Sequence, residues 1–488
     1  MKRFSVLLTM MTLTSWPVAV HAEPMMTAAA DTAFREGQRS LDAALRRTPN
    51  TGKAKNIILF IGDGMGINSV TAGRILAGQT RGLDGASYSL SFDAFPYTAL
   101  SKTYAADALV TDSANGISAI TTGFKTINGA IGVNGKVRPK DCATGLANRV
   151  SNIAEQAKRK GLSTGVVTTS ALTDATPAGF YGHIASRDWQ ADTDMPAEVT
   201  KAGCTDLARQ LVEAPDNVRL DVALGGGAAK FLPKAVGSAG ARGDNRDLTK
   251  LWRTQTPAAK FVTTAKGLNA VETKNTNSLL GIFAPSHLPS VIDHDKFPDT
   301  PSLAEMTSKA IEVLSKNPKG YVLLVESASI DKWHHRNNAY RALTDVDELS
   351  KAVAVAVDKS DPAETLIIVT ADHSHALAMS GYAAREADIL GLARQKGVNQ
   401  LDKTGKPRTI LSYASGPGEQ DHEHELTQAE AVGPDFLQPA LVPLSSAAHG
   451  GEDVPVYAYG PQAHLISGTV ESSYIYHVMA YALSLSED

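Results

Sequence analysis

The sequence predicts an α/β protein with a doubly wound, mostly parallel central sheet, helices on both faces and a surface insertion near the candidate site. Short apolar runs that end in Gly, Ser or Asp predict buried strands. They are NIILFIG (56–62), STGVVTTS (163–170), LDVALGGG (220–227), GYVLLVES (320–327), TLIIVTADH (365–373) and VPVYAYGP (454–461). Helical apolar spacing is found between them, at 146–161, 303–317 and 340–357. Strands that alternate with helices form parallel sheets covered on both faces.

Two segments do not follow this alternation. Residues 228–262 show no clear period and are expected to be irregular. Residues 376–448 separate a His-containing strand end from His449 and contain the Gly-, Pro- and charge-rich run GPGEQDHEHE (416–425). This second segment is predicted to be a crown-like surface insertion, on which His422 and His424 would lie in a solvated acidic loop. Residues 23–488 are otherwise expected to form a single domain.

The first 22 residues have the pattern of a signal peptide. A short basic start (residues 2–3) precedes a mostly apolar run (4–20), and residues 20–22 have the small-residue pattern of a cleavage site. An uncleaved membrane anchor is the alternative, but the run is short and is interrupted by Pro17. The mature chain is therefore expected in the periplasm or outside the cell, with no membrane anchor.

Composition narrows the class of protein further. Of the 488 residues, 43% are hydrophobic and 20% charged, which suits a globular chain with a large core. The formal net charge of -4 leaves no basic face for nucleic acid or an anionic membrane. The two cysteines, Cys142 and Cys204, suggest one disulfide in an exported protein, with two free buried thiols as the alternative.

Acidic residues and histidines stand next to the predicted strands. They are Asp63 after the first strand, Glu326, Asp331 and His335 after the fourth, Asp372 and His373 after the fifth, and His449 before the last. Ligands of parallel sheets bind at the carboxyl ends of the strands. Mixed carboxylates and imidazoles suit zinc, whereas oxygen-only sets suit magnesium. One such residue is usually a cap or a solvated loop residue, but several at one sheet edge predict a metal centre.

The segment LVTDSANGISAITTG (109–123) adds a candidate nucleophile. Ser113 stands where an extended run becomes a helix, so its hydroxyl would lie at a helix N-terminus, where an anion is favoured. Taken alone, Asp112 and Ser113 before a helix are more often an N-cap. The nearby metal-ligating pattern makes the nucleophile the stronger hypothesis.

Six motifs, in order, resemble those of the alkaline phosphatases. They are IGDGMG (61–66), TDSAN with TTGFKT and GAIGV behind it (111–133), TDATPAGFYGHIASRDW (173–189), VESASIDKWHH (325–335), VTADHSHA (369–376) and HGGEDVPVYAYGP (449–461). The resemblance runs from about residue 55 to the C-terminus. It implies a metal-dependent enzyme that hydrolyses phosphate monoesters through a phosphoserine on Ser113, with broad tolerance of the leaving group.

The resemblance also implies two zinc ions and one magnesium ion per chain. The first zinc would be held by Asp331, His335 and His449, and the second by Asp63, Asp372 and His373, with the Ser113 oxygen completing its shell in the free enzyme. Asp63 would also bridge to a magnesium ion held by Thr176 and Glu326. A serine hydroxyl is a poor nucleophile near neutral pH, and coordination to a metal would lower its pKa.

Further residues are assigned by the same resemblance. Arg187 would bind two phosphate oxygens with its planar guanidinium, and Asp112 would orient it. Asp174 would reach the magnesium ion through water and hold Lys332, which would contact phosphate through water. His375 would be a partner of a metal ligand.

The sequence combines features of two branches of the family. The pairing of Asp174 with Lys332 resembles bacterial enzymes, whereas SRDWQADTDMP (186–196) and HGGED resemble animal enzymes. Animal enzymes carry a Glu after Phe at a calcium site, and Ala284 stands there in this chain, so the resemblance does not extend to that site. The resemblance also implies a homodimer, in which residues 376–448 would contribute to the interface.

Two alternatives share some of these features. A related bimetal phosphodiesterase or sulfatase would have the same metal core, but the sulfatase motif is absent, and diesterases generally lack the pairing of an arginine with a magnesium site. Arg187 and Thr176 therefore favour monoesters. A non-catalytic metal- or phosphate-binding protein would need no nucleophile, so the intact Ser113 argues against it.

Overall fold

The computed structural model describes residues 31–485, except 235–238, 257 and 420–423. The predicted signal peptide and the expectation for His422 lie outside these residues. The chain divides into two compact units, one up to Thr48 and one from Pro49 onwards. The first contains helix α1 (Thr32–Arg46), which begins after Asp31, whose side chain accepts a hydrogen bond from the backbone N–H of Phe34.

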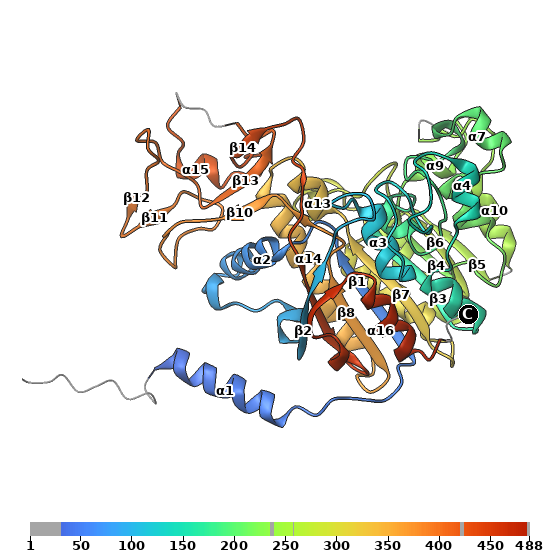
Figure 1. The fold of residues 1–488 in the computed structure, drawn as a ribbon, viewed down its shortest axis with the longest axis horizontal. Coiled ribbons are helices and arrows are strands. Elements are labelled where there is room, and N and C mark those ends of the chain that lie inside the picture. The colour runs from blue at the N-terminus through green and yellow to red at the C-terminus, as the bar shows by residue number, and fades with distance from the viewer. Residues whose placement is uncertain (1–30, 235–238, 257, 420–423, 486–488) are drawn as a thin grey trace, which may run out of the picture. The chain divides into compact units, whose positions relative to one another are not determined.

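A ten-stranded sheet runs through the second unit, and the predicted fold class is confirmed (Figure 1). Its order is β17-β2-β16-β8-β1-β7-β3-β4-β6-β5. The strands are β1 (Asn56–Gly62), β2 (Tyr97–Lys102), β3 (Ser163–Ala171), β4 (Val222–Gly226), β5 (Ala259–Val262), β6 (Ser278–Ile282), β7 (Tyr321–Ser327), β8 (Thr365–Thr370), β16 (Val454–Tyr459) and β17 (Gly468–Glu471). Strand β16 is antiparallel to β8 and β2, and the other pairings are parallel.

The six predicted strands are present, and the four that the pattern missed lie at the two ends of the sheet. The strands β2, β5 and β17 are partly exposed, so none of them is a continuous apolar run. The fourth, β6, is buried but short and contains a glycine. Of these four strands, β17 and β5 are the edge strands, which lack a neighbour on one side, and β2 and β6 lie next to them.

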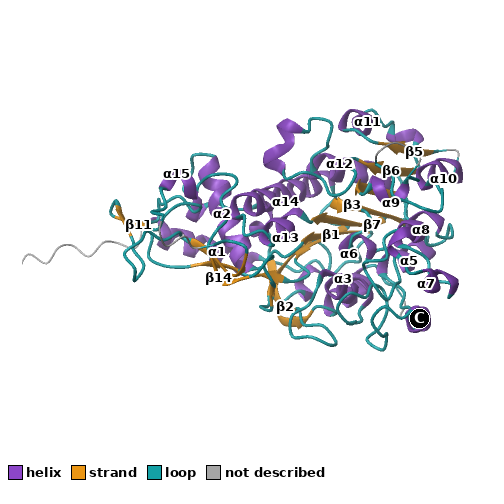
Figure 2. Cartoon of the chain, turned by 90° about the horizontal axis from the view of Figure 1, so that it is seen from above, coloured by secondary structure: helices purple, strands orange, loops and turns teal. Residues whose placement is uncertain are grey.

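Helices cover both faces of the sheet (Figure 2). They are α2 (Ile67–Thr80), α3 (Ser113–Thr122), α4 (Cys142–Ala147), α5 (Ile153–Arg159), α6 (Ala175–Ala178), α7 (Ala197–Lys201), α8 (Leu207–Glu213), α9 (Ala228–Phe231), α10 (Leu248–Gln255), α11 (Ala265–Asn269), α12 (Leu303–Leu314), α13 (Ser329–His334), α14 (Ala339–Lys359), α15 (Gln428–Ala431) and α16 (Tyr474–Ala482). Alternate β1 residues face opposite sides: Ile57 and Leu59 share one core cluster with α3 and α16, and Ile58 and Phe60 another with α12 and α14. Within the described residues, no helix combines the length and the apolar character that crossing a membrane requires.

Two local expectations are wrong. The helix predicted over 146–161 is divided, because α4 ends at Ala147 and α5 begins only at Ile153. Asn152 caps α5 by accepting from the backbone N–H of Glu155, whose side chain accepts from Asn152 in return. Such a capping box starts a helix where the apolar spacing alone would continue one. Residues 228–262, expected to be irregular, contain α9, α10 and β5.

Residues 376–448 fold largely outside the main sheet. They contain β10 (Leu377–Met379), β13 (Leu411–Gly416) and β14 (Ala440–Pro443) in one small sheet and β11 (Arg394–Gln395) and β12 (Val398–Asn399) in another. At their base, β15 (His449–Gly450) pairs with β9 (Ser374–His375), and His449 lies opposite His375. This pairing brings the end of the segment back to its beginning, and so places His449 next to the end of β8.

A disulfide joins Cys142 at the start of α4 to Cys204 after α7. The alternative of two free thiols is therefore excluded. The bridge spans 62 residues of sequence, and closing a loop of that length in the unfolded chain contributes on the order of 4 kcal/mol to stability.

Helix α14 buries a carboxyl group, Asp345, whose Oδ2 accepts a hydrogen bond of 2.8 Å from Ser290 Oγ. Burial raises the pKa of Asp345 to about 7, and the nearby Glu348 adds to this rise. The folded protein therefore keeps a proton on Asp345 up to about pH 7, whereas the unfolded chain releases it near about pH 4. Its contribution to stability is complete below the unfolded pKa and is lost as the pH rises through the folded pKa.

We predict that the free energy of unfolding of Asp345→Asn increases relative to that of the parent protein as the pH rises from about 4 to about 8. The increase should reach up to about 4 kcal/mol, because the parent loses the contribution of the protonated carboxyl group and the variant does not. Urea unfolding at a series of pH values, with metal content held constant, measures the difference between the two proteins. Asp347→Asn is the matched control, because it removes a carboxylate that is paired with Arg81 and should instead destabilise the fold. A difference between Asp345→Asn and parent that does not change with pH would contradict the prediction.

Candidate functional site

The carboxyl ends of β1 and β8 bring Asp63, Asp372 and His373 to the N-terminus of α3. His373 Nε2 lies 3.3 Å from Asp63 Oδ1 and 3.4 Å from Asp372 Oδ2. Ser113 Oγ lies 3.2 Å from the same nitrogen and 3.4 Å from Asp63 Oδ1. All four side chains are buried. The first residue of α3 is thus directed at the same point as three candidate metal ligands.

Two glycines allow these elements to approach so closely. Gly64 has a φ of +66°, and a Cβ there would lie 3.2 Å from Asp331 Cα. On α3, a Cβ at Gly116 would lie 2.8 Å from the carbonyl oxygen of Asp372. A side chain at either position would push apart the segments that carry the site.

A second group lies beside the first and consists of Asp331, His335, His375 and His449. His335 Nε2 is 3.4 Å from Asp331 Oδ2, and His449 Nε2 is 3.6 Å from Asp331 Oδ1. The two Nε2 atoms of His335 and His449 are 3.2 Å apart. His375, expected from sequence only as a partner of a ligand, places its Nε2 3.4 Å from Asp331 Oδ1 and so lies within this group.

Backbone carbonyl groups orient three of the imidazoles. The Nδ1 atom of His373 lies 3.0 Å from the carbonyl oxygen of Ser374, and that of His335 lies 2.7 Å from that of Ala447. The Nδ1 atom of His449 lies 2.9 Å from the carbonyl oxygen of Thr111. A proton on each Nδ1 leaves each Nε2 as a lone-pair donor toward the centre, the arrangement found in metal-bound histidines.

Glu326, at the end of β7, is buried against two hydroxyls of β3 that sequence reasoning missed. Thr168 Oγ1 donates to Glu326 Oε2, and Ser170 Oγ lies 3.2 Å from the same oxygen. Burial raises the pKa of Glu326 to about 7, although the Thr168 hydrogen bond works against it. On the adjacent α6, Thr176 Oγ1 lies 3.5 Å from Asp63 Oδ2. The sequence did contain a signal for this contact, because Thr168 and Ser170 stand at alternate positions of one strand and therefore face the same side.

The donor set fits divalent cations. Among the described residues, Asp331 Oδ1, Asp372 Oδ2 and His375 Nε2 are buried and make no hydrogen bond, although imidazole nitrogens lie 3.4 Å from both oxygens. Burial, together with the negative charges of Asp372 and Asp331, raises the pKa of Asp63 well above its ordinary value. Unpaired buried acceptors and crowded carboxylates are costly by themselves, and a cation bound among them removes both costs. The ligands are carboxylates and imidazoles, which zinc accepts.

Next to these groups, an ion-pair network holds the predicted phosphate-binding residues. Arg187 lies between two carboxylates, with one guanidinium nitrogen 3.2 Å from Asp112 Oδ2 and another 3.1 Å from Asp174 Oδ1. Lys332 Nζ lies 2.8 Å from Asp174 Oδ2. Burial raises the pKa of Asp174, but Lys332 and Arg187 outweigh it and hold that pKa well below its ordinary value. Asp174 is thus ionised and links both cations.

Asp112 is fixed from three sides. It caps α3 by accepting from the backbone N–H of Asn115 at 3.1 Å, and it accepts from Gly129 N–H at 3.0 Å. The residue is therefore an N-cap and also contacts Arg187, so the two interpretations of the Asp112–Ser113 pair are compatible.

One residue near this network gave no signal in the sequence. His287 follows β6, a strand that the pattern missed, and its Nδ1 lies 3.8 Å from Asp174 Oδ2. Although 39% of the His287 side chain is exposed, loss of water around its ring and the positive charge of Lys332 lower its pKa to about 4. His287 is therefore neutral at neutral and alkaline pH. His424, by contrast, is exposed as expected.

Known proteins resemble this chain along most of its length. The sequence profile of the family described as "Alkaline phosphatase" matches residues 54–485. The alkaline phosphatase of Gadus morhua is 40% identical over 467 residues, which is 92% of this chain and 96% of that protein. The tissue-nonspecific isozyme of Gallus gallus is 41% identical over 465 residues, covering 92% of this chain and 88% of that protein.

Solved structures show the same fold. The alkaline phosphatase of Thermus thermophilus superposes with a TM-score of 0.64 and 22% identity, covering 91% of this chain and 94% of that one. The enzyme from the Antarctic bacterium TAB5 gives a TM-score of 0.62 and 22% identity, covering 89% of this chain and 100% of that one.

Because the buried carboxylates need a counter-charge, we predict that removing divalent ions destabilises the protein. Exhaustive chelation should abolish phosphatase activity and lower the thermal unfolding midpoint, and zinc with magnesium should restore both. When the free ion concentration is 100 times the Kd of a site, binding at that site adds about 2.7 kcal/mol to the free energy of unfolding. Chelator already saturated with zinc is the control. An unchanged midpoint in protein shown by elemental analysis to be metal-free would contradict the prediction.

Proposed function

The chain belongs to the alkaline phosphatase family and hydrolyses phosphate monoesters, and from this premise we propose that Ser113 is the nucleophile and carries the phosphate as an intermediate. The observation that supports this most is the position of Ser113 Oγ. It lies at the N-terminus of the ten-residue helix α3, within 3.4 Å of both Asp63 and His373. A phosphate at this point also benefits from the partial positive charge of the helix end.

The metal-binding side chains are typical of alkaline phosphatases, and the proposal names two zinc ions and one magnesium ion. Asp331, His335 and His449 would hold one zinc and Asp63, Asp372 and His373 the other, whereas Asp63, Thr176 and Glu326 would hold the magnesium. His375 remains a partner of Asp331 in this scheme. Bound there, the ions supply positive charge that lowers the pKa of an adjacent hydroxyl or water and stabilises a leaving oxygen.

The proposed reaction has two displacements. Ser113 Oγ loses its proton and forms a bond to phosphorus, while the bond from phosphorus to the ester oxygen breaks and the leaving alcohol takes up a proton. Water then attacks the phosphoserine, which releases inorganic phosphate and restores the Ser113 hydroxyl. Splitting the reaction in this way replaces one difficult step with two easier ones.

The charged residues around Ser113 would bind the phosphoryl group. Arg187 presents a planar pair of donors to two oxygens, a geometry that a lysine cannot offer. Asp112 orients the guanidinium, and Asp174 positions both Arg187 and Lys332. A phosphate monoester has more free oxygens than a diester, so this donor set supports the preference for monoesters over the related diesterase chemistry.

The same proposal includes location and assembly. A disulfide supports a periplasmic or secreted protein, because such bonds persist in oxidising compartments.

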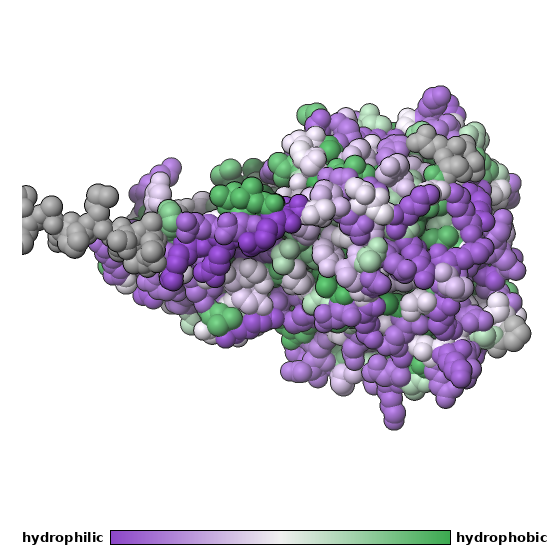
Figure 3. All heavy atoms as spheres, turned by 90° about the horizontal axis from the view of Figure 1, so that it is seen from below, coloured by the Kyte–Doolittle hydropathy of each residue, from purple (hydrophilic) through white to green (hydrophobic). Residues whose placement is uncertain are grey.

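We expect a homodimer in which residues 376–448 contribute to the interface. Support comes from large exposed apolar side chains on this segment, of which Leu441 is 83% and Tyr382 82% exposed. On the face drawn in Figure 3, apolar residues form small patches separated by mostly hydrophilic residues.

Ser113→Ala should eliminate the phosphoenzyme and lower turnover by several orders of magnitude. The intermediate is trapped by acid quenching during turnover of a phosphate monoester and located by mass spectrometry. Ser118→Ala is a control on the same helix, where Ser118 Oγ donates to the carbonyl of Ala114. A phosphate trapped on any other residue would show that the nucleophile has been assigned wrongly.

Lys332→Ala should raise the inhibition constant for inorganic phosphate and preserve or raise kcat at alkaline pH. The reason is that Lys332 would stabilise bound product as well as the transition state, so that weakening this contact speeds release where release limits turnover. Asp174→Ala should in addition weaken magnesium binding. Steady-state kinetics with phosphate as competitor, at several magnesium concentrations, measures both effects. An unchanged phosphate inhibition constant in Lys332→Ala would leave that residue only the structural ion pair seen here.

A further inference from the structure

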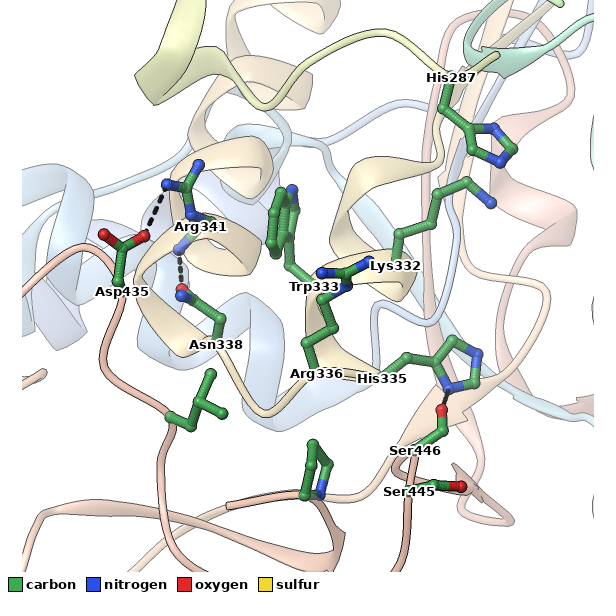
Figure 4. Close-up of a pocket in the computed structure, with 12 residues that line it drawn as sticks. His287, Lys332, Trp333, His335, Arg336, Asn338, Arg341, Asp435, Ser445 and Ser446 are labelled. Atoms are coloured by element: carbon green, nitrogen blue, oxygen red, sulfur yellow. Dashed lines mark hydrogen bonds and ion pairs between the residues drawn. The ribbon is translucent and has the colours of Figure 1, made fainter. Parts of the chain in front are cut away.

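A cleft of about 800 Å³ opens beside the proposed phosphate site. Lys332 and His335 line it at one end, so the cleft begins where the phosphate site ends. Trp333 and Arg336, from the same turn of chain, form one wall, and Ser445 and Ser446 lie opposite (Figure 4). A substrate with its phosphate on Ser113 would extend its leaving group into this space.

The cations of this cleft differ in their pairing. Lys332 is bound to Asp174, and Arg341 donates to Asp293 and to Asp435. Of the described residues that line the cleft, Asp435 is the one carboxylate, and Arg341 pairs with it.

Arg336 has no such partner among the residues that the structure describes. No carboxylate of the described chain lies within 4.0 Å of its guanidinium, which instead lies over the Trp333 ring at 5.5 Å from the ring centroid. Figure 4 shows Arg336 beside Trp333, with Lys332 and His335 on one side and the Arg341–Asp435 pair on the other. The ring contact restrains the guanidinium, and its charge is left for a ligand.

The spacing along the chain determines where that ligand charge would lie. Arg336 comes four residues after Lys332, and the backbone N–H of Arg336 bonds to the carbonyl of Trp333, so the helical turn continues to Arg336. Lys332 and Arg336 both line the cleft, and Arg336 comes one turn of chain after Lys332. Arg336 is therefore about one helical turn beyond the residue proposed to contact phosphate.

We propose that Arg336 selects phosphate monoesters whose leaving group carries a second anionic group, such as a carboxylate, about one helical turn from the phosphate. This inference rests on the proposed function, because it assumes that the phosphate lies on Ser113. Neutral leaving groups still enter the cleft but gain nothing from the guanidinium. The cleft thus adds a preference among leaving groups to an enzyme that otherwise recognises the phosphoryl group.

The test compares 4-carboxyphenyl phosphate with its neutral analogue of similar size, 4-carbamoylphenyl phosphate, at low ionic strength. The measured quantity is the ratio of the two kcat/KM values, so the intrinsic reactivity of each substrate cancels between proteins. Arg336→Met should lower this ratio about three- to fivefold, the effect of one partly exposed charge pair. Arg336→Glu should lower it further, because it replaces attraction with repulsion.

Arg253→Met is the matched control, since Arg253 also lies over an aromatic ring, that of Phe261, but on α10 beside the edge strand β5. It should leave the ratio at the parental value. A ratio that is the same in Arg336→Met and parent, in enzymes that hydrolyse the neutral substrate, would overturn this inference alone. Failure of the metal-loaded parent to hydrolyse either substrate would instead overturn the proposed function.

Discussion

The crowding of buried carboxylates at one edge of the sheet is the constraint on which the site depends. Parallel strands β1, β7 and β8 end side by side, and each delivers an acidic side chain to the same small volume. Burial and mutual repulsion raise the pKa of Asp63 and of Glu326. Unneutralised, these carboxylates are costly to bury, and a cation bound among them removes that cost.

The rest of the site depends on how that edge is covered. Helix α3 brings Ser113 to the carboxylates because Gly116 lets it approach the backbone of Asp372. The β9–β15 pairing returns the chain to the same edge after the insertion and places His449 beside His375. The insertion can therefore vary in its own small sheets without moving the histidine at its base.

A second electrostatic unit lies next to the metal ligands. Asp174 is the shared carboxylate of Arg187 and Lys332, and the two cations keep it ionised despite its burial. Such a shared carboxylate positions two donors at once. Arg336 stands one turn farther along the same segment and has no carboxylate partner in the described part of the chain, which is why the proposed choice among leaving groups is assigned to it.

The sequence by itself determined the central strands, the two long helices and the motif residues, because continuous apolar runs and helical spacing are local signals. The capping box at Asn152 and the strands β2, β5 and β17 near the ends of the sheet were missed, since a cap competes with the apolar period and these strands are only partly buried. Only the tertiary structure decided which side chains meet. The contacts of Glu326 with Thr168, of His287 with Asp174 and of His375 with Asp331 join strand ends far apart in the chain. Residue types and spacing along a chain do not contain those distances, because they arise from the order in which parallel strands are placed in the sheet.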